Sequence, residues 1–403
     1  MRLALLGLDE TTLALARAAQ RSGHDQLVLL CDVEGTQQAQ SLLGGDALRT
    51  QSWEVLLTGA TGGVAAFDAV MVSRDFADDE RRLEQLRKLV QGGVPMLVAH
   101  PVHTSMLAYY ELDMIRRETD GVIVPFLPAR RHPLAVRLKE IVNLTDASSV
   151  GRVDQVVFER ALTERSKAAV LSQFARDVDL LRFLGGEVAQ LGAMGSPGLT
   201  AVGEFAAYNN LGVQMTGAEN RLFRWWVVPA DEFSDSRLTV TGERGKATLT
   251  MPLEPSAWRL ELRTGGEPTV VEALPWNPYL TSLDELRGVL ADRQILSRWP
   301  DAARAVELTE TIDRSLAKGR TIDLYEQEYS PSATFKGIMS SVGCALLLLA
   351  LAGMIIGALA ANLLKHAGFV QAAQVVGAVP YVLLGLLVVF LALQFLLRVA
   401  RPK

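Results

Sequence analysis

The sequence is poor in cysteine and lacks the signatures of several large enzyme classes. Only Cys31 and Cys344 are present among its 403 residues, which excludes a disulfide framework or a cysteine-based zinc site and is typical of a reducing compartment. The metalloprotease pattern H-E-x-x-H, the P-loop pattern and the hydrolase pattern G-x-S-x-G are all absent. Metalloprotease, NTPase and hydrolase functions therefore have no support, and no metal is expected.

Acidic residues are missing from the C-terminal part of the chain. None follows Glu328, whereas five basic residues do: Lys336, Lys365, Arg398, Arg401 and Lys403. Since the formal net charge of the whole chain is −5, the preceding part is distinctly acidic. A nucleic-acid partner requires a basic face, so the charge distribution argues against one.

Two long apolar stretches occupy the same C-terminal part. Residues 337–364 contain no charged side chain, and residues 376–397 are almost as apolar. A membrane-spanning helix needs roughly 20 apolar residues, so we expect two spans with the lipid bilayer as a partner, a linker at 329–336 and a loop at 365–375. The basic flanks place the head and both termini in the cytoplasm. The alternative is a buried helical hairpin of a soluble core.

The first residues have the layout of a dinucleotide-binding unit. An apolar run ends at Gly7, a helical pattern follows, and a second apolar run ends at Asp32. In the G-x-G-x-x-G turn of a Rossmann unit the glycines allow close approach of a pyrophosphate. Only Gly7 is kept, and Asp9 and Thr12 stand at the second and third glycine positions. Alternating strand and helix patterns up to residue 125 predict a Rossmann-like α/β domain at 1–125.

The pattern changes after about residue 125. Strands are predicted at 153–160, 222–228, 238–241, 247–251 and 259–263, with a hairpin turn at Gly242–Gly245, and helices at 282–293 and 301–318. Short strands separated by turn signals are typical of an antiparallel sheet. We therefore predict an α+β domain with an open antiparallel sheet at 126–328.

Four segments, in collinear order, resemble the Gfo/Idh/MocA family, which includes glucose–fructose oxidoreductase and inositol dehydrogenase. Residues 93–101, ending in Ala99-His100-Pro101, resemble the strand end G-K-x-V-x-x-E-K-P. Residues 171–186 resemble the helix start D-x-G-x-H-x-x-D, residues 238–245 the hairpin I-x-G-x-x-G, and residues 301–319 the last helix. The resemblance covers roughly 1–325 and implies NAD(P)-dependent hydride transfer at a hydroxyl of a sugar or cyclitol. It also implies a homo-oligomer formed through the sheet of the second domain.

The resemblance assigns three candidate catalytic positions, and all three have changed. The family's lysine becomes His100, its aspartate Ser172 and its histidine Arg176. His100 is either a general acid or base, given the ordinary pKa of histidine, or a structural residue. Arg176 either binds a small anionic ligand or pairs with Asp179.

Six residues are candidates for cofactor binding: Gly7, Asp9, Thr12, Asp32, Ser73 and Pro101. An acid at Asp32 would accept bonds from ribose hydroxyls and disfavour a 2′-phosphate, so NAD is expected over NADP. Asp9 either repels a pyrophosphate or caps the following helix.

Two further groups of residues have open roles. The basic cluster Arg130-Arg131-His132 is either a solvated face or part of an anion site. The tryptophans at 225, 226, 258 and 276 fit a core or an oligomer face.

Three functions remain open at this point. The first is a membrane-anchored oxidoreductase that acts on a sugar-like alcohol with His100 in place of the lysine. The second is a catalytically inert ligand-binding or scaffolding module at the cytoplasmic membrane face. The third is a sensor that binds NAD without turnover. A fold does not establish a function when the site residues differ.

Overall fold

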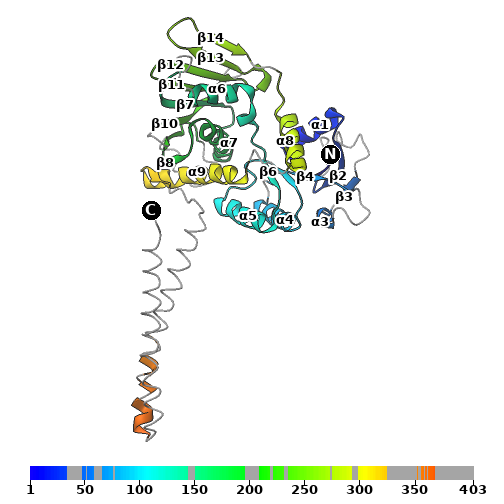
Figure 1. Cartoon of the computed structure of the whole chain (residues 1–403), viewed down its shortest axis with the longest axis vertical. Helices are drawn as coiled ribbons and strands as arrows, with labels where there is room; N and C mark the ends of the chain where they lie inside the picture. The colour runs from blue at the N-terminus through cyan, green and yellow to red at the C-terminus, as the bar shows by residue number, and fades with distance from the viewer. Residues whose placement is uncertain are drawn as a thin grey trace. The chain divides into compact units, whose positions relative to one another are not determined.

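The structure is a computed structural model. It describes residues 1–33, 48–50, 52–58, 66–75, 78–143, 150–195, 208–217, 221–230, 235–272, 275–292 and 298–324, together with 352, 355–357, 359–360 and 362–367. Two compact units are present, Met1–Leu324 and Tyr325–Lys403. Figure 1 labels helices and strands of the first unit.

The first sheet has six strands in the order β3-β2-β1-β4-β5-β6, and every neighbouring pair is parallel. This is the strand order of a dinucleotide-binding Rossmann fold, which confirms the predicted parallel sheet. The strands are β1 (Arg2–Leu6), β2 (Gln26–Cys31), β3 (Leu48–Thr50), β4 (Ala69–Val72), β5 (Met96–Val98) and β6 (Ile123–Pro125).

Helices cover both faces of this sheet, because its strands are apolar on both sides. One face packs against α1 (Glu10–Ser22) and α8 (Pro278–Asp292), and the other against α4 (Asp79–Gln91), α5 (Met106–Thr119) and α9 (Trp299–Lys318). The short helix α3 (Val55–Thr58) also joins the second face. Helices α8 and α9 come from the far end of the unit, so the chain returns to the first sheet after building the second.

The second sheet has nine strands in the order β14-β13-β12-β11-β7-β10-β9-β8-β15. All neighbouring pairs are antiparallel except β7 and β10, which run parallel. The expected antiparallel sheet is therefore a mixed one. The strands are β7 (Val153–Leu162), β8 (Val188–Met194), β9 (Gly212–Gly217), β10 (Leu222–Pro229), β11 (Ser236–Gly242), β12 (Gly245–Met251), β13 (Arg259–Arg263), β14 (Thr269–Glu272) and β15 (Ile322–Asp323).

The parallel pair arises from the connection between its strands. Helix α7 (Lys167–Gly185), β8 and β9 separate β7 from β10 along the chain, so β10 enters the sheet in the direction of β7. The hairpin prediction is confirmed, since Gly242 and Gly245 are paired at the turn between β11 and β12.

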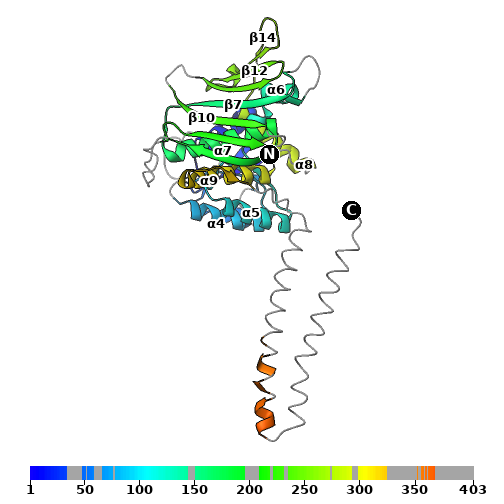
Figure 2. The same ribbon diagram turned by 90° about the vertical axis from the view of Figure 1, so that its left-hand side faces the viewer.

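One face of the second sheet packs on helices, as Figure 2 shows for α7 and α9. Helix α6 (Pro133–Asn143) contributes to the same core. The short 3-10 turn η1 (Pro128–Arg131) comes before α6, and η4 (Pro255–Ala257) lies between β12 and β13. Trp225 is completely buried in this core, which settles the core alternative for that tryptophan. The predicted oligomer through the sheet remains a prediction.

Among the described residues, no helix is both long and apolar enough to cross a membrane. The predicted span at 376–397 and the predicted linker at 329–336 lie outside the described residues. Only separate short stretches of the predicted span at 337–364 and of the loop at 365–375 are described, and they are helical or a turn.

Candidate functional site

The turn after β1 is tightly packed by the protein's own side chains. Gly7 has a φ of +72°, and a Cβ built on it would lie 2.2 Å from Ser73 Oγ and 2.3 Å from Arg82 Nη2. Any side chain at position 7 would clash with these two groups. Gly7 is therefore required here by backbone conformation and by the close approach of Arg82, whether or not a ligand binds.

Asp9 caps helix α1. Its Oδ1 accepts the backbone N–H of Thr12 at 2.7 Å and the Thr12 hydroxyl at 2.9 Å, and Thr12 Oγ1 accepts the N–H of Asp9 at 2.9 Å. The second carboxylate oxygen, Oδ2, accepts the backbone N–H of Arg74 at 3.0 Å. The capping alternative for Asp9 is confirmed, because these bonds form a complete capping box.

Asp32 ends β2 in a left-handed conformation with a φ of 50°. Its Oδ2 accepts bonds from Arg81 Nη2 at 2.8 Å and from Gln85 Nε2 at 2.7 Å, both on α4. Gln85 in turn accepts a bond from Arg82 Nη1 at 2.9 Å. The acid expected to accept ribose hydroxyls thus already receives two donors from the protein.

The fold family implies a dinucleotide at this edge of the sheet, so the fit of these residues can be tested. A pyrophosphate at a Rossmann turn is bound by free N–H groups at the helix N-terminus. The carboxylate of Asp9 already accepts the N–H of Thr12 there, and it adds a negative charge where a second one would be repelled. Arg82 covers Gly7 on the other side. In this arrangement the turn does not fit a pyrophosphate.

His100 is buried at the end of β5, with its side chain 2% exposed. Its Nδ1 lies 3.4 Å from the Tyr109 hydroxyl and its Nε2 lies 3.4 Å from the carbonyl oxygen of Ala175. Burial and the positive charge of Arg176 lower the pKa of His100 to about 3. His100 is therefore neutral near pH 7. Pro101, which follows it, is buried as well.

Arg176 and His100 are brought together, and Ser172 lies one turn earlier on the same helix, α7. Arg176 Nε donates to the carbonyl oxygen of His100 at 2.9 Å, and the Arg176 side chain is exposed. The alternative pairing of Arg176 with Asp179 is wrong, because the Asp179 carboxylate receives Arg130 instead, from Nε at 2.9 Å and also from Nη2.

The three residues of the basic cluster at 130–132 do not form a solvated face, and each has a different partner. Arg130 is paired with Asp179, and Arg131 Nη1 lies 2.8 Å from Glu285 Oε2. His132 is buried, with its ring 4.1 Å from that of Trp258. The solvated-face interpretation is wrong because the cluster serves internal ion pairs and ring packing.

Sequence reasoning missed the inward-facing residues of α4. Arg82 and Gln85 are 3% and 1% exposed, although such side chains are mostly exposed in folded proteins. The sequence contains a weak signal for this burial, since Arg82 and Gln85 lie on the same helix face as the buried Leu86 and Leu89.

Sequence reasoning also missed a buried carboxylate, Asp177. It receives Arg160 Nε at 2.8 Å, Gln173 Nε2 at 2.9 Å and Trp225 Nε1 at 2.9 Å. Nothing in the local sequence marks it, because its partners come from three elements.

Comparison with solved structures finds the same fold in sugar and inositol oxidoreductases. Aldose-aldose oxidoreductase from Caulobacter crescentus, complexed with glycerol, has a TM-score of 0.66 at 16% identity over 80% of this chain and 99% of its own. A myo-inositol dehydrogenase from Corynebacterium glutamicum has a TM-score of 0.63 at 18% identity over 81% and 99%. An oxidoreductase from Agrobacterium radiobacter, in complex with NAD+, L-tartaric acid and magnesium, has a TM-score of 0.65 at 15% identity over 80% and 98%.

These matches show that about 80% of the chain has the fold of the oxidoreductases named above. No protein-family model matches the chain, and no curated protein sequence does. Because the identities are low, the fold is what the comparison establishes, and function must be argued from the residues.

Proposed function

We propose that this protein is a catalytically inert relative of sugar and cyclitol dehydrogenases that binds a small anionic or sugar-like ligand. The observation that carries the proposal is the position of the Asp9 carboxylate, which accepts the N–H groups of Thr12 and Arg74. In dinucleotide-binding proteins of this fold a phosphate lies at this turn. Here the carboxylate occupies the position of that phosphate.

The residues at the reacting end support the same proposal. Oxidation of an alcohol requires a base that takes the hydroxyl proton as hydride leaves the carbon. Burial lowers the pKa of His100 to about 3, so it is a weak base, and a guanidinium at Arg176 has no lone pair to accept a proton. Ser172 is not a base without a partner that activates it. None of the three positions supplies the base.

Arg176 suits ligand binding better than catalysis. Its Nε is bonded to the carbonyl oxygen of His100, which fixes the orientation of the guanidinium. Within the described part of the chain, its two terminal nitrogens make no hydrogen bond or ion pair. They form an edge that matches a carboxylate or phosphate in bidentate geometry.

A second candidate function is an active NAD-dependent oxidoreductase. The specific observation in its favour is that Gly7 and Asp32 keep the positions expected at the ends of β1 and β2, in a sheet with the Rossmann strand order. This second function requires Asp32 to accept hydrogen bonds from ribose hydroxyls instead of from Arg81 and Gln85. NAD would then be preferred over NADP.

We also propose that the tail anchors the protein to the cytoplasmic membrane face. The support is the sequence itself, namely two apolar stretches at 337–364 and 376–397 with basic flanks.

The experiment that tests the proposed function is a turnover screen of the full chain. The detergent-solubilised protein is incubated with NAD+ or NADP+ and a panel of aldoses, aldonates and cyclitols, and reduced cofactor is followed by absorbance. We expect no turnover above the rate of an Arg176→Gln, His100→Gln double variant. Turnover in the wild type that is lost in the double variant would establish the second candidate.

A further inference from the structure

A cavity of about 450 Å³ lies away from the turn that holds Asp9, among helices α6, α7 and α9. Its walls include five basic residues, which are Arg130, Lys139, Arg182, Arg221 and Arg298, and only two acidic ones, Glu187 and Asp301. A volume in this range is typical of small-molecule sites.

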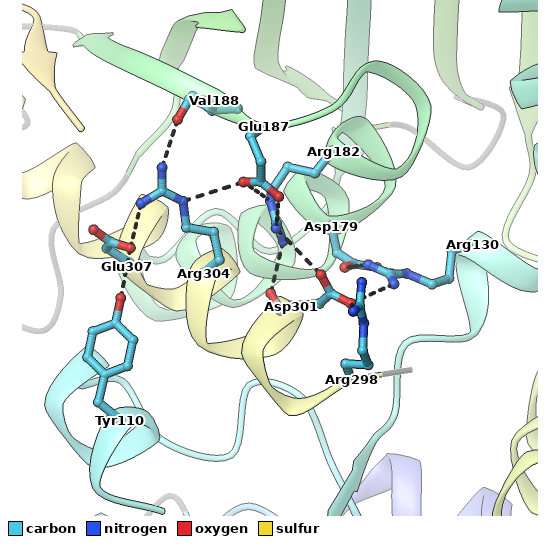
Figure 3. Close-up of polar contacts among 10 residues, drawn as sticks. All are labelled: Tyr110, Arg130, Asp179, Arg182, Glu187, Val188, Arg298, Asp301, Arg304 and Glu307. Atoms are coloured by element: carbon cyan, nitrogen blue, oxygen red, sulfur yellow. Dashed lines mark hydrogen bonds and ion pairs between the residues drawn. The ribbon is translucent and has the colours of Figure 1, made fainter. Parts of the chain in front are cut away.

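One carboxylate in this cavity is shared among three arginines. Asp301 Oδ2 lies 3.1 Å from Arg130 Nη1 and 3.9 Å from Arg298 Nε, and Oδ1 lies 3.5 Å from Arg182 Nη2. Figure 3 shows these guanidinium groups converging on Asp301. A single negative charge cannot neutralise three positive ones, so the arrangement has an excess of positive charge.

The neighbouring carboxylates reduce this excess but do not remove it. Asp179 is paired with Arg130 and Glu187 with Arg182. Arg304, which also approaches Glu187 at 3.6 Å, has its own partner, Glu307, at 2.7 Å. Among the residues that the structure describes, the five basic residues of the wall therefore face three carboxylates, which leaves two positive charges without a described carboxylate.

The two remaining cations are Lys139 and Arg221. Lys139 Nζ lies 4.0 Å from the centre of the Phe183 ring, and Arg221 Nη1 donates to the carbonyl oxygen of Gly185 at 3.1 Å. Among the residues that the structure describes, neither has a carboxylate partner. The groups that hold them on the wall, an aromatic ring and a backbone carbonyl, carry no negative charge.

The N-terminus of α9 also favours an anion in this cavity. This helix runs from Trp299 to Lys318, and its N-cap residue Arg298 makes no side-chain capping bond. The positive end of a helix dipole favours an anion. It adds to the field of the basic residues around Asp301.

We propose that this cavity is an anion site for a phosphate monoester. An excess of two positive charges matches a phosphate monoester dianion near pH 7, and guanidinium groups bind phosphate oxygens in bidentate geometry. The phosphate is carried either by a soluble metabolite or by a lipid headgroup, since both present the same chemistry. The site is separate from the one that the proposed function assigns to Arg176.

The test is isothermal titration of the full chain in detergent with inorganic phosphate, in a phosphate-free buffer. We expect saturable binding to the wild type and affinity at least about tenfold weaker in a Lys139→Gln, Arg221→Gln double variant, because each substitution removes a charge-assisted donor. Neither residue is in an ion pair that the structure describes, so the double variant leaves no described acid without its partner.

Two controls show whether the effect is specific to the cavity. Arg137→Gln removes an exposed cation that lies on α6, like Lys139, but outside the cavity. It should bind phosphate as the wild type does, and the charge-preserving Lys139→Arg, Arg221→Lys variant should stay within about threefold of the wild type. The proposal is overturned if the Gln double variant binds normally, if Arg137→Gln weakens binding as much, or if the wild type shows no saturable binding.

A second measurement identifies the source of the phosphate. The same titration is repeated with vesicles of phosphatidylcholine, with or without phosphatidic acid, whose headgroup is a phosphate monoester. Competition by phosphatidic acid that disappears in the Gln double variant supports the site and assigns it to a lipid. Undiminished binding of free phosphate in its presence supports the site and assigns it to a soluble ligand.

Discussion

The carboxylate of Asp9 accepts the backbone N–H of Arg74 at 3.0 Å and so joins the start of α1 to the end of β4. The two residues are 65 positions apart in the chain, but the parallel sheet places the ends of β1 and β4 side by side. One side chain therefore caps a helix and ties together two adjacent connections at the carboxyl-terminal edge of the first sheet.

The first prediction concerns the stability of this cap. Asp9→Ala should lower the free energy of unfolding of the full chain by about 1–2 kcal/mol, since it removes an N-cap and leaves the Arg74 N–H without its acceptor. Chemical denaturation followed by circular dichroism measures the change. Glu10→Gln, at the exposed neighbouring position, should cost less than about 0.5 kcal/mol. Equal losses in the two variants would show that Asp9 is not the cap.

The second prediction concerns pH. Burial and Arg176 lower the pKa of His100 from 6.5 to about 3, so between these values the unfolded chain binds a proton that the folded chain does not. His100 therefore destabilises the fold progressively as the pH falls below about 6.5, by up to about 1.4 kcal/mol per pH unit. In His100→Gln the dependence of unfolding free energy on pH should be shallower by that amount between pH 6 and 4. An unchanged slope would mean that His100 is accessible and charged.

The third prediction separates the backbone role of Asp32 from its charge. Asp32 has a φ of 50°, which asparagine adopts more readily than alanine. The Arg81 side chain is 53% exposed, so the ion pair itself contributes less than about 1 kcal/mol. Asp32→Asn should therefore be tolerated, and Asp32→Ala should be less stable than Asp32→Asn by about 1 kcal/mol. Thermal unfolding of the two variants compares them directly, and identical midpoints would contradict the conformational argument.

The fourth prediction concerns the buried carboxylate of Asp177. Its side chain is 4% exposed and receives Arg160, Gln173 and Trp225. Asp177→Asn leaves the partly buried Arg160 guanidinium without its charge partner and should lower stability by about 2–4 kcal/mol. The exposed pair Arg137–Glu140 provides the control, since Glu140→Gln should change stability by less than about 1 kcal/mol. Comparable losses at the two positions would show that Asp177 is solvated.

The sequence predicts the elements of this fold well because their residues carry local signals. Strands β1 and β4 are continuous apolar runs since both of their faces are buried, and β13 is predicted with the bounds that the structure has. Helices α8 and α9 follow from their patterns within four residues at each end. The hairpin at Gly242–Gly245 follows from its turn residues.

The sequence predicts the location of a site residue only where that residue ends a strand of the parallel sheet. Gly7, Asp32 and His100 lie at strand ends, so the sheet brings them to one edge. Arg82 could not be predicted there, because a charged helix residue is normally exposed and only the packing of α4 turns it inward. The pairing of Arg130 with Asp179 spans 49 residues, and no local pattern encodes such a contact.

A fifth prediction addresses the proposed membrane anchor. The full chain should remain in the membrane pellet after an alkaline carbonate wash of cells that express it. Leu347→Asp combined with Leu386→Asp should release it, since each acid at the centre of a span costs about 3 kcal/mol. Ser332→Asp adds the same charge in the linker outside both spans and should leave the protein in the pellet. A wild-type chain in the soluble fraction would contradict the anchor.

The most direct test of the account is titration of the detergent-solubilised full chain with NAD+ and NADH, alongside Asp9→Gly. The account predicts no saturable binding to the wild type below about 1 mM, because the Asp9 carboxylate holds the N–H of Thr12 and repels a pyrophosphate. It predicts tighter binding in Asp9→Gly, where both obstacles are removed. Saturable micromolar binding of NAD(H) by the wild type, unchanged or weakened in Asp9→Gly, would contradict the central claim.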